Sequence, residues 1–269
     1  MMTKQVLIFD SGVGGLSIFQ EIMHKNPNIN SFYLFDNACF PYGELEDNFL
    51  IKRLTGLLLS FVKKQHIDLI VIACNSASTV ALDALRSHFS IPVVGVVPAI
   101  KPAARLTENG VIGLLATPAT IRRDYTSLLI NEFAADIEVL KIGSTELVKL
   151  AEEKLHGFDI DKKRLQKILE PWTILQKKPD TLILGCTHFP LLKSEISSFF
   201  ESRIQLVDSG KAIASRVCQL LGEQQDEQIS NQHLAYYTKP YGVAAQQKLV
   251  ALRSRFSAYG FHSLDHYTA

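Results

Sequence analysis

The chain has 269 residues, of which 47% are apolar, enough for a substantial core and too many for a disordered protein. Its 28 Lys and Arg residues nearly balance its 27 Asp and Glu residues and form no basic cluster, so there is no electrostatic footprint for nucleic acid. No run approaches the roughly 18 apolar residues that would span a membrane, and no signal peptide precedes the first predicted strand, so we expect a cytoplasmic protein.

The first predicted strand, residues 6–9, ends in the sequence DSGVGGLS and leads into a helix at 16–24. Such a glycine-rich turn can gather backbone N–H groups around an anion. This turn lacks the Lys and Ser/Thr of a P-loop, and a tight turn without a ligand is the alternative. Asp10 stands at the strand tip, where we expect its carboxylate at the edge of the sheet.

A second strand is predicted at residues 31–35, and Cys39 and the loop Pro41-Tyr42-Gly43 follow it. The loop is expected either to lie over the edge of the sheet or to be an ordinary surface loop. An amphipathic helix is predicted at residues 49–64.

The segment LIVIACNSAS, residues 69–78, is the most informative stretch of the chain. Its apolar run is rich in β-branched residues without a polar face, which is typical of a buried parallel strand. Cys74 follows the strand, at the edge where α/β sheets usually bind ligands. Asn75 and Ser76 are N-cap residues, so a helix should begin here, and its dipole should lower the pKa of the thiol below about 8.5.

The next strands are predicted at residues 91–97 and 111–116, with a crossover near Pro98. Thr117 and Thr120 follow the second of these, where their hydroxyls bind a ligand or cap the helix predicted at 121–133. A short strand at 137–140 precedes a helix at 144–155, whose glutamates at positions 146, 152 and 153 we expect mostly on a solvated face. A helix from Asp161 should break or kink near Pro171.

A matching pattern occurs at residues 181–192, TLILGCTHFPLL. An apolar run is again followed by a small residue and a cysteine, Cys186, and then by Thr187 and His188. Two cysteines on matching scaffolds indicate a doubled unit with one thiol from each half.

The chain continues with a strand at 205–207, the sequence Asp208-Ser209-Gly210 and a helix at 211–221. A polar linker at 222–231 is expected to be a loop, followed by a strand at 233–237 and a last helix at 244–256. Cys218 falls on the apolar side of its helix, which favours a core thiol.

Alternating strands and helices predict an α/β fold of two similar lobes, each a mainly parallel sheet flanked by helices, with the site in the cleft between them. The first lobe should comprise residues 1–97 and 208–269, with Asp10 and Cys74. The second should comprise residues 98–207, with Glu152, Cys186 and His188.

Two thiols on opposite sides of a small molecule suit the inversion of a stereocentre. One thiolate removes a proton from carbon, and the other thiol supplies one from the opposite face. The four cysteines form no Cys-x-x-Cys pair and are expected to be free thiols. No lysine suggests a Schiff base and no motif suggests a metal, so the chemistry should need neither cofactor nor metal. Donors near the thiols are Asn75, Ser76 and Thr187, while Asp10 and His188 are candidate proton handlers.

Five segments in this order resemble the bacterial glutamate racemases of the Asp/Glu racemase family: FDSGVGGLS, FPYGE, ACNSAS, GCTHFPLL and VDSG. The resemblance covers nearly the whole chain and implies conversion of L-glutamate to D-glutamate for peptidoglycan synthesis, without pyridoxal phosphate. It also implies a homodimer.

The resemblance implies that Cys74 and Cys186 are the paired acid and base and that Asp10, His188 and Glu152 assist them. The implied substrate contacts are Asp10, Ser11, Pro41, Tyr42, Gly43, Asn75, Ser76, Thr117, Thr120, Thr187 and His188.

The sequence departs from the family pattern at Ser76, where a threonine is common, although the hydroxyl is kept. Helix register leaves Glu153 as an alternative to Glu152, and Cys39 has no assigned role. The segment LAEEKLHG resembles the branch that UDP-N-acetylmuramoyl-alanine activates, although the N-terminal extension often seen there is missing here.

Three other functions remain open from the residues. A racemase of the same type could act on aspartate or a hydantoin, and a two-lobed amino-acid sensor would have merely buried cysteines. A cysteine hydrolase would need a histidine paired with its nucleophile, and the sequence supplies none to Cys74.

Overall fold

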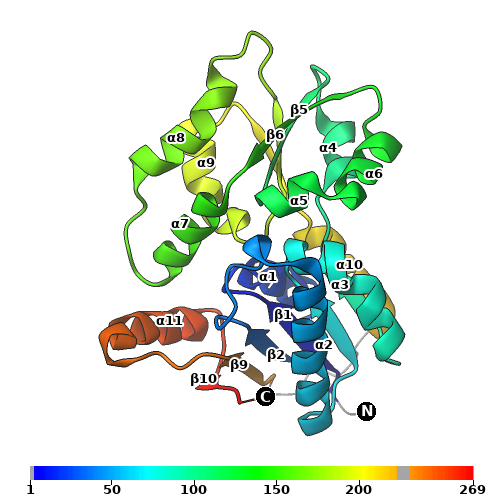
Figure 1. Ribbon diagram of the computed structural model, residues 1–269, viewed down its shortest axis with the longest axis vertical. Coiled ribbons are helices and arrows are strands. Elements are labelled where there is room, and N and C mark those ends of the chain that lie inside the picture. The colour runs from blue at the N-terminus through cyan, green and yellow to red at the C-terminus, as the bar shows by residue number, and fades with distance from the viewer. Residues whose placement is uncertain (1–2, 223–230, 269) are drawn as a thin grey trace.

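The computed structural model describes residues 3–222 and 231–268, and these form two parallel β-sheets, each flanked by helices (Figure 1). The expected linker at 222–231 lies almost entirely outside the described residues. The α/β class predicted from the sequence is confirmed. Within the described ranges, no helix is long and apolar enough to cross a membrane.

The first sheet has the strand order β10-β9-β2-β1-β3-β4, and every neighbouring pair is parallel. Its strands are β1 (Gln5–Asp10), β2 (Asn30–Phe35), β3 (Leu69–Ile72), β4 (Val93–Gly95), β9 (His233–Tyr237) and β10 (Ser263–His266). The strands β9 and β10, which follow residue 208, therefore belong to the first sheet.

Alternate side chains of the central strand β1 enter two separate cores, because successive residues of a strand point to opposite faces. Val6 and Ile8 pack with α1 (Leu16–Lys25), α10 (Gly210–Leu221) and α11 (Gln246–Ala258). Leu7 and Phe9 pack with α2 (Asp47–Lys64) and α3 (Asn75–His88). All four strand residues are fully buried, so the sheet is covered on both faces.

The second sheet has the order β6-β5-β7-β8 and is also parallel throughout. Its strands are β5 (Val111–Ala116), β6 (Glu138–Gly143), β7 (Thr181–Leu184) and β8 (Gln205–Val207). Its helices are α4 (Ile100–Leu106), α5 (Pro118–Arg122), α6 (Asp124–Phe133), α7 (Thr145–Leu155), α8 (Lys162–Thr173) and α9 (Lys193–Phe199).

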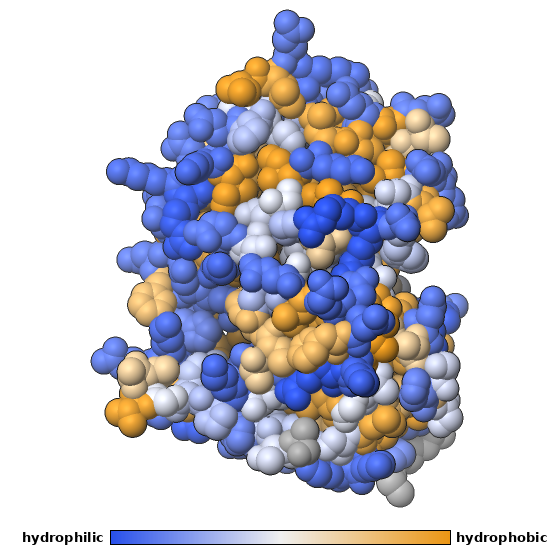
Figure 2. Space-filling model, in the orientation of Figure 1, coloured by the Kyte–Doolittle hydropathy of each residue, from blue (hydrophilic) through white to orange (hydrophobic). Residues whose placement is uncertain are grey.

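The strand β7 repeats the alternation seen in β1. Leu182 and Leu184 pack in the core that contains α7 and α8, whereas Ile183 packs in the core that contains α4. Buried side chains thus account for the high apolar fraction, and Figure 2 shows a largely hydrophilic face with apolar patches between polar side chains.

Several elements differ from the sequence prediction. The helix predicted at 121–133 is divided at Arg123 into α5 and α6, and α4 and α9 were not predicted. The helix α8 continues across Pro171 and ends two residues later at Thr173. The strand at 91–97 is reduced to β4, Val93–Gly95. Strand β10 was not predicted, because only Leu264 among its four residues is buried and its sequence, SLDH, has no apolar run.

Candidate active site at the strand ends

The predicted site residues lie at the carboxyl ends of the central strands of both sheets. Asp10 is the last residue of β1, and Cys74 follows the neighbouring strand β3. Cys186 follows β7, and Thr117 follows β5, its neighbour. Both cysteines are 6% exposed, whereas Asp10 is fully buried.

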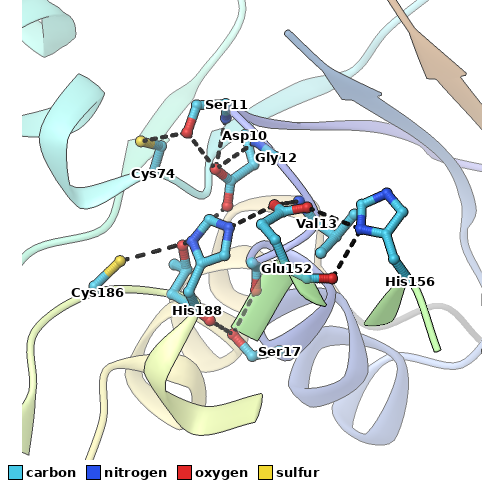
Figure 3. Close-up of polar contacts among 12 residues, drawn as sticks. Asp10, Ser11, Gly12, Val13, Ser17, Cys74, Glu152, His156, Cys186 and His188 are labelled. Carbon is cyan, nitrogen blue, oxygen red and sulfur yellow. Dashed lines mark hydrogen bonds and ion pairs between the residues drawn. The ribbon is translucent and has the colours of Figure 1, made fainter. Parts of the chain in front are cut away.

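Asp10 connects the Cys74 segment to the second half of the chain (Figure 3). Its Oδ1 accepts hydrogen bonds from Ser11 Oγ at 3.2 Å and from the backbone N–H of Gly12 at 3.3 Å. Its Oδ2 accepts one from Thr187 Oγ1 at 2.9 Å. Ser11 Oγ in turn lies 3.7 Å from the sulfur of Cys74. One buried carboxylate thus holds residues beside both thiols.

Cys186 has its own titratable partner. Its sulfur lies 3.7 Å from His188 Nδ1, within hydrogen-bond range for sulfur. The other ring nitrogen, Nε2, lies 2.8 Å from Glu152 Oε1, which also accepts a hydrogen bond from the backbone N–H of Val13 at 2.7 Å. Figure 3 shows His188 between the carboxylate and the sulfur.

Glu152 is 14% exposed in its side chain, so our expectation of a solvated face was wrong for this residue. Glu153 instead pairs with Arg164 at 2.7 Å and is 39% exposed. The structure therefore brings Glu152 to the predicted site and leaves its neighbour on the surface.

The glycine-rich turn accommodates side chains from the second half. A Cβ at Gly14 would lie 2.4 Å from His188 Nδ1, and one at Gly12 would lie 2.1 Å from Glu152 Oε1. No real Cβ approaches so closely. The glycines thus make room for the imidazole and the carboxylate, and the backbone N–H groups of Gly12 and Val13 donate to the carboxylates of Asp10 and Glu152.

Burial and charge shift the pKa values of these groups in opposite directions. Burial alone would lower the pKa of His188, but hydrogen bonds and charge interactions with Cys186 and Glu152 raise it well above its usual value. Burial would raise the pKa of Glu152, but His188 lowers it below its usual value. The two therefore form a buried imidazolium–carboxylate pair. For Asp10 burial dominates and raises the pKa.

The pKa of Cys74 is raised rather than lowered, contrary to our expectation. Burial is the largest cause, and the negative charge of Asp10 adds to it. Cys186 adds a smaller electrostatic contribution in the same direction. Cys74 does sit at the N-terminus of α3, but the helix dipole does not outweigh desolvation.

Buried polar side chains follow Cys74 and the neighbouring strand end at Thr117. Asn75 Nδ2 is buried without a hydrogen-bond partner. Ser76 Oγ lies 3.1 Å from Thr117 Oγ1, which donates to Thr120 Oγ1 at 3.0 Å. Thr117 also caps α5 by accepting from the Thr120 backbone N–H, so both functions considered for these threonines are compatible.

The side chain of Tyr42 is 1% exposed and does not face open space. Its hydroxyl donates a hydrogen bond to Asp36 Oδ2 at 2.8 Å. A Cβ at Gly43 would lie 3.2 Å from Thr117 Cβ, so the backbone of the Pro41-Tyr42-Gly43 loop is what lies against the second half.

Sequence reasoning missed His156, Asp36 and Arg53. His156 Nδ1 lies 2.8 Å from the backbone oxygen of Glu152 and 3.8 Å from its Oε2, and its i,i+4 spacing from Glu152 was a usable signal. Asp36, which is fully buried, forms an ion pair with Arg53 that had no local signal.

Cys39 and Cys218 do not join this cluster. Cys39 is partly exposed, and burial and the charge of Asp36 raise the pKa of its thiol. Cys218 lies on α10 and is also partly exposed, so it is less buried than we expected.

Comparison with known proteins adds independent observations. Residues 19–217 match the family model described as Asp/Glu/Hydantoin racemase. A glutamate racemase of Pectobacterium atrosepticum is 48% identical over 97% of this chain and 90% of its own length. Glutamate racemases of several Salmonella strains are also 48% identical over 97% of this chain.

Two solved structures extend the similarity to the fold. Escherichia coli glutamate racemase, in complex with L-glutamate and the activator UDP-MurNAc-Ala, is 46% identical with a TM-score of 0.91 and covers 99% of both chains. Glutamate racemase isoform RacE1 of Bacillus anthracis is 28% identical with a TM-score of 0.81 and covers 98% of this chain and 97% of its own.

Proposed function

The chain belongs to the Asp/Glu/Hydantoin racemase family, and we propose that Cys74 and Cys186 are the two bases with which it racemises glutamate. The observation that carries the proposal is that each thiol has its own buried polar partner, Ser11 for Cys74 and His188 for Cys186. The bond between Thr187 and Asp10 joins these two environments.

The reaction requires a proton to leave the α-carbon on one face and another to arrive on the opposite face. A thiolate on one side accepts the first proton, and a thiol on the other donates the second. The raised pKa of Cys74 keeps it as a neutral thiol, which is the form that donates. After turnover the two sulfurs have exchanged protonation states, so the reverse reaction uses the same pair with their roles exchanged.

We assign supporting roles to the titratable groups beside the thiols. The imidazolium of His188, held by Glu152, places a positive charge and an exchangeable proton 3.7 Å from the Cys186 sulfur. Asp10 acts on the Cys74 side through Ser11. The positive charge of His188 stabilises the negative charge that develops on the substrate when the α-proton leaves.

Polar side chains and backbone groups from both halves would hold the substrate between the thiols. We propose that the substrate contacts come from Asp10, Ser11, Asn75, Ser76, Thr117, Thr120, Thr187, His188 and the backbone of Pro41, Tyr42 and Gly43. The unpartnered Nδ2 of Asn75 supports this, because a buried donor without a partner costs free energy until a ligand accepts from it.

We further propose that residues 1–97 with 208–269 and residues 98–207 act as two lobes that enclose the substrate. D-Glutamate made by a cytoplasmic enzyme of this family serves peptidoglycan synthesis. A homodimer is part of the same proposal.

UDP-N-acetylmuramoyl-alanine is proposed as an activator because the similar E. coli enzyme carries it in its complex. A cavity of about 460 Å³ beside the site supports this, since it reaches Glu152 and is lined by Lys149, Lys239, Lys248 and Tyr241. Lysines bind phosphate as point charges, and an aromatic ring can stack on uracil. Lys248→Gln should weaken activation, whereas Lys211→Gln on α10 should not.

The direct test measures optical inversion of L-glutamate by purified wild-type protein and by Cys74→Ala and Cys186→Ala. Each cysteine variant should lose racemisation while keeping its circular-dichroism spectrum, and Cys218→Ala is the matched control that should keep full activity. Turnover that persists in either single variant would exclude the two-thiol mechanism. A panel with aspartate and hydantoins separates the runner-up substrates, and a stable acyl-enzyme in mass spectra would indicate a hydrolase instead.

A further inference from the structure

Asp36 lies outside the proposed catalytic cluster and is nevertheless a fully buried carboxylate with four side-chain hydrogen bonds. Arg53 of α2 donates from Nε to Oδ2 at 2.9 Å and from Nη2 to Oδ1 at 2.8 Å. Tyr42 donates to Oδ2 at 2.8 Å, and Thr238, directly after β9, donates to Oδ1. A buried charge requires such complete pairing, because an unpaired carboxylate in the interior would be strongly destabilising.

The pairing keeps Asp36 ionised. Burial would raise its pKa, but the hydrogen bonds from Arg53, Thr238 and Tyr42 outweigh it and lower the pKa below its usual value. Charge-assisted hydrogen bonds of this kind are about twice as strong as neutral ones, so the hydroxyl of Tyr42 is firmly held.

The same residue is tied to the first half of the proposed site. The backbone N–H of Asp36 donates to the carbonyl oxygen of Asp10 at 3.0 Å, so Asp36 sits directly at the end of β1. Tyr42 also packs its ring against Phe9, with 6.0 Å between the ring centroids. The position of the Tyr42 backbone relative to Asp10 is thereby fixed from two sides.

We propose that Asp36 and Arg53 are positioning residues, which act through the hydroxyl of Tyr42 to hold the Pro41-Tyr42-Gly43 backbone at the distance from Thr117 that glutamate binding requires. The inference rests on the proposed function, because it assumes that this loop contacts the substrate. Since Gly43 brings the loop backbone against Thr117, a small outward shift at Tyr42 would widen the space for the substrate. Such a shift weakens binding of the ground state and the transition state alike, and therefore raises KM more than it lowers kcat.

The test compares Tyr42→Phe, Arg53→Lys and Arg53→Met with Tyr267→Phe. Tyr267 is a matched control because it lies in the same core as Tyr42, is 8% exposed and bonds through its hydroxyl to Ser60 of α2, 3.0 Å away. We expect KM for glutamate to rise about three- to tenfold in Tyr42→Phe, with kcat within about twofold of wild type. Arg53→Lys should have a KM between wild type and Arg53→Met, because lysine keeps the charge and loses the bidentate geometry.

An unchanged KM in Tyr42→Phe, or an equal rise in Tyr267→Phe, would overturn the proposal, because the effect would then be absent or merely one of stability. If Arg53→Met does not fold, Tyr42→Phe and Arg53→Lys decide. Calorimetric titration of glutamate into Cys74→Ala, with and without Tyr42→Phe, measures the same loss of affinity without turnover. If the two-thiol mechanism is wrong, Tyr42→Phe should still raise the Kd for glutamate. If the positioning role of Asp36 and Arg53 is wrong, the Kd should not change, whatever the mechanism of proton transfer.

Discussion

Thr187 Oγ1 donates a hydrogen bond to Asp10 Oδ2 at 2.9 Å, which joins the segment after β7 to the last residue of β1. Asp10 is fully buried, and burial raises its pKa despite this bond and the nearby charge of His188. The carboxylate is therefore held at the site against a desolvation cost, as expected of a functional group rather than a structural one.

Asp10→Asn should make the protein more stable at neutral pH while it impairs racemisation. The folded-state pKa of Asp10 lies above the unfolded value, so its contribution favours folding below the unfolded pKa and is lost as pH rises through the folded pKa. Asparagine has nearly the same shape and does not titrate. The Tm difference between variant and wild type should therefore grow as pH rises from about 4 to 7, as measured by thermal melts across that range.

Asp68→Asn provides a control of opposite sign. Asp68 accepts from the backbone N–H of Gln5 at 2.8 Å and from Lys4 at 3.0 Å, and these bonds outweigh burial and lower its pKa. Its stabilisation is present above the unfolded pKa and is lost as pH falls through the folded pKa. The variant should thus be less stable at pH 7, and equal behaviour of the two variants would contradict the assignment.

Gly14→Ala should reduce both stability and activity, because the new Cβ would lie 2.4 Å from Nδ1 of the buried His188 ring. Overpacking of this kind costs about 1–3 kcal/mol, and the ring must also move relative to Cys186. Gly56→Ala is the control, since Gly56 lies inside α2 and a Cβ there would have nothing within 4 Å. It should be stabilising by about 0.5–1 kcal/mol in denaturant titrations, and a neutral effect of Gly14→Ala would show that the turn is looser than described.

The strand cores and the strand-end thiols could be predicted because their signals are local. The run LIVI of β3 and the run TLIL of β7 are apolar or nearly so throughout, and each leads within two residues to a cysteine. The duplication of this pattern located both thiols without any knowledge of packing.

Properties that depend on packing between distant segments could not be predicted. The pKa of Cys74 is set by burial and by Asp10, which belongs to a different strand. The prediction of a lowered pKa considered only the dipole of the helix that follows Cys74. Glu152 carries a surface-like sequence environment, and its hydrogen bonds to Val13 and His188 join segments far apart in the sequence. Asp36 and Arg53 likewise meet only when α2 packs on the sheet.

Racemisation in deuterated water should place deuterium at the α-carbon of the product from the first turnovers. With two bases, the proton removed from L-glutamate stays on one sulfur, while the product receives a solvent-derived deuteron from the other. Proton NMR of the α-position, followed with circular dichroism of the product, measures this. D-glutamate that retains the original hydrogen would indicate a single shared base.

Glu152→Gln should lower the pKa of His188 and reduce racemisation on the order of 10²-fold, because the imidazolium loses its buried counter-charge. The folded-state pKa of His188 lies above its unfolded value, so the stability that the pair contributes is fully present below about pH 6.5 and is lost as pH rises through the folded pKa. In the variant that loss should begin at lower pH. NMR titration of the His188 ring follows the pKa, and thermal melts follow the stability.

Glu153→Gln is the matched control, because Glu153 pairs with Arg164 on the surface and should leave the titration of His188 and turnover unchanged. Identical His188 titration in both variants would mean that Glu152 is not the partner that sets its charge.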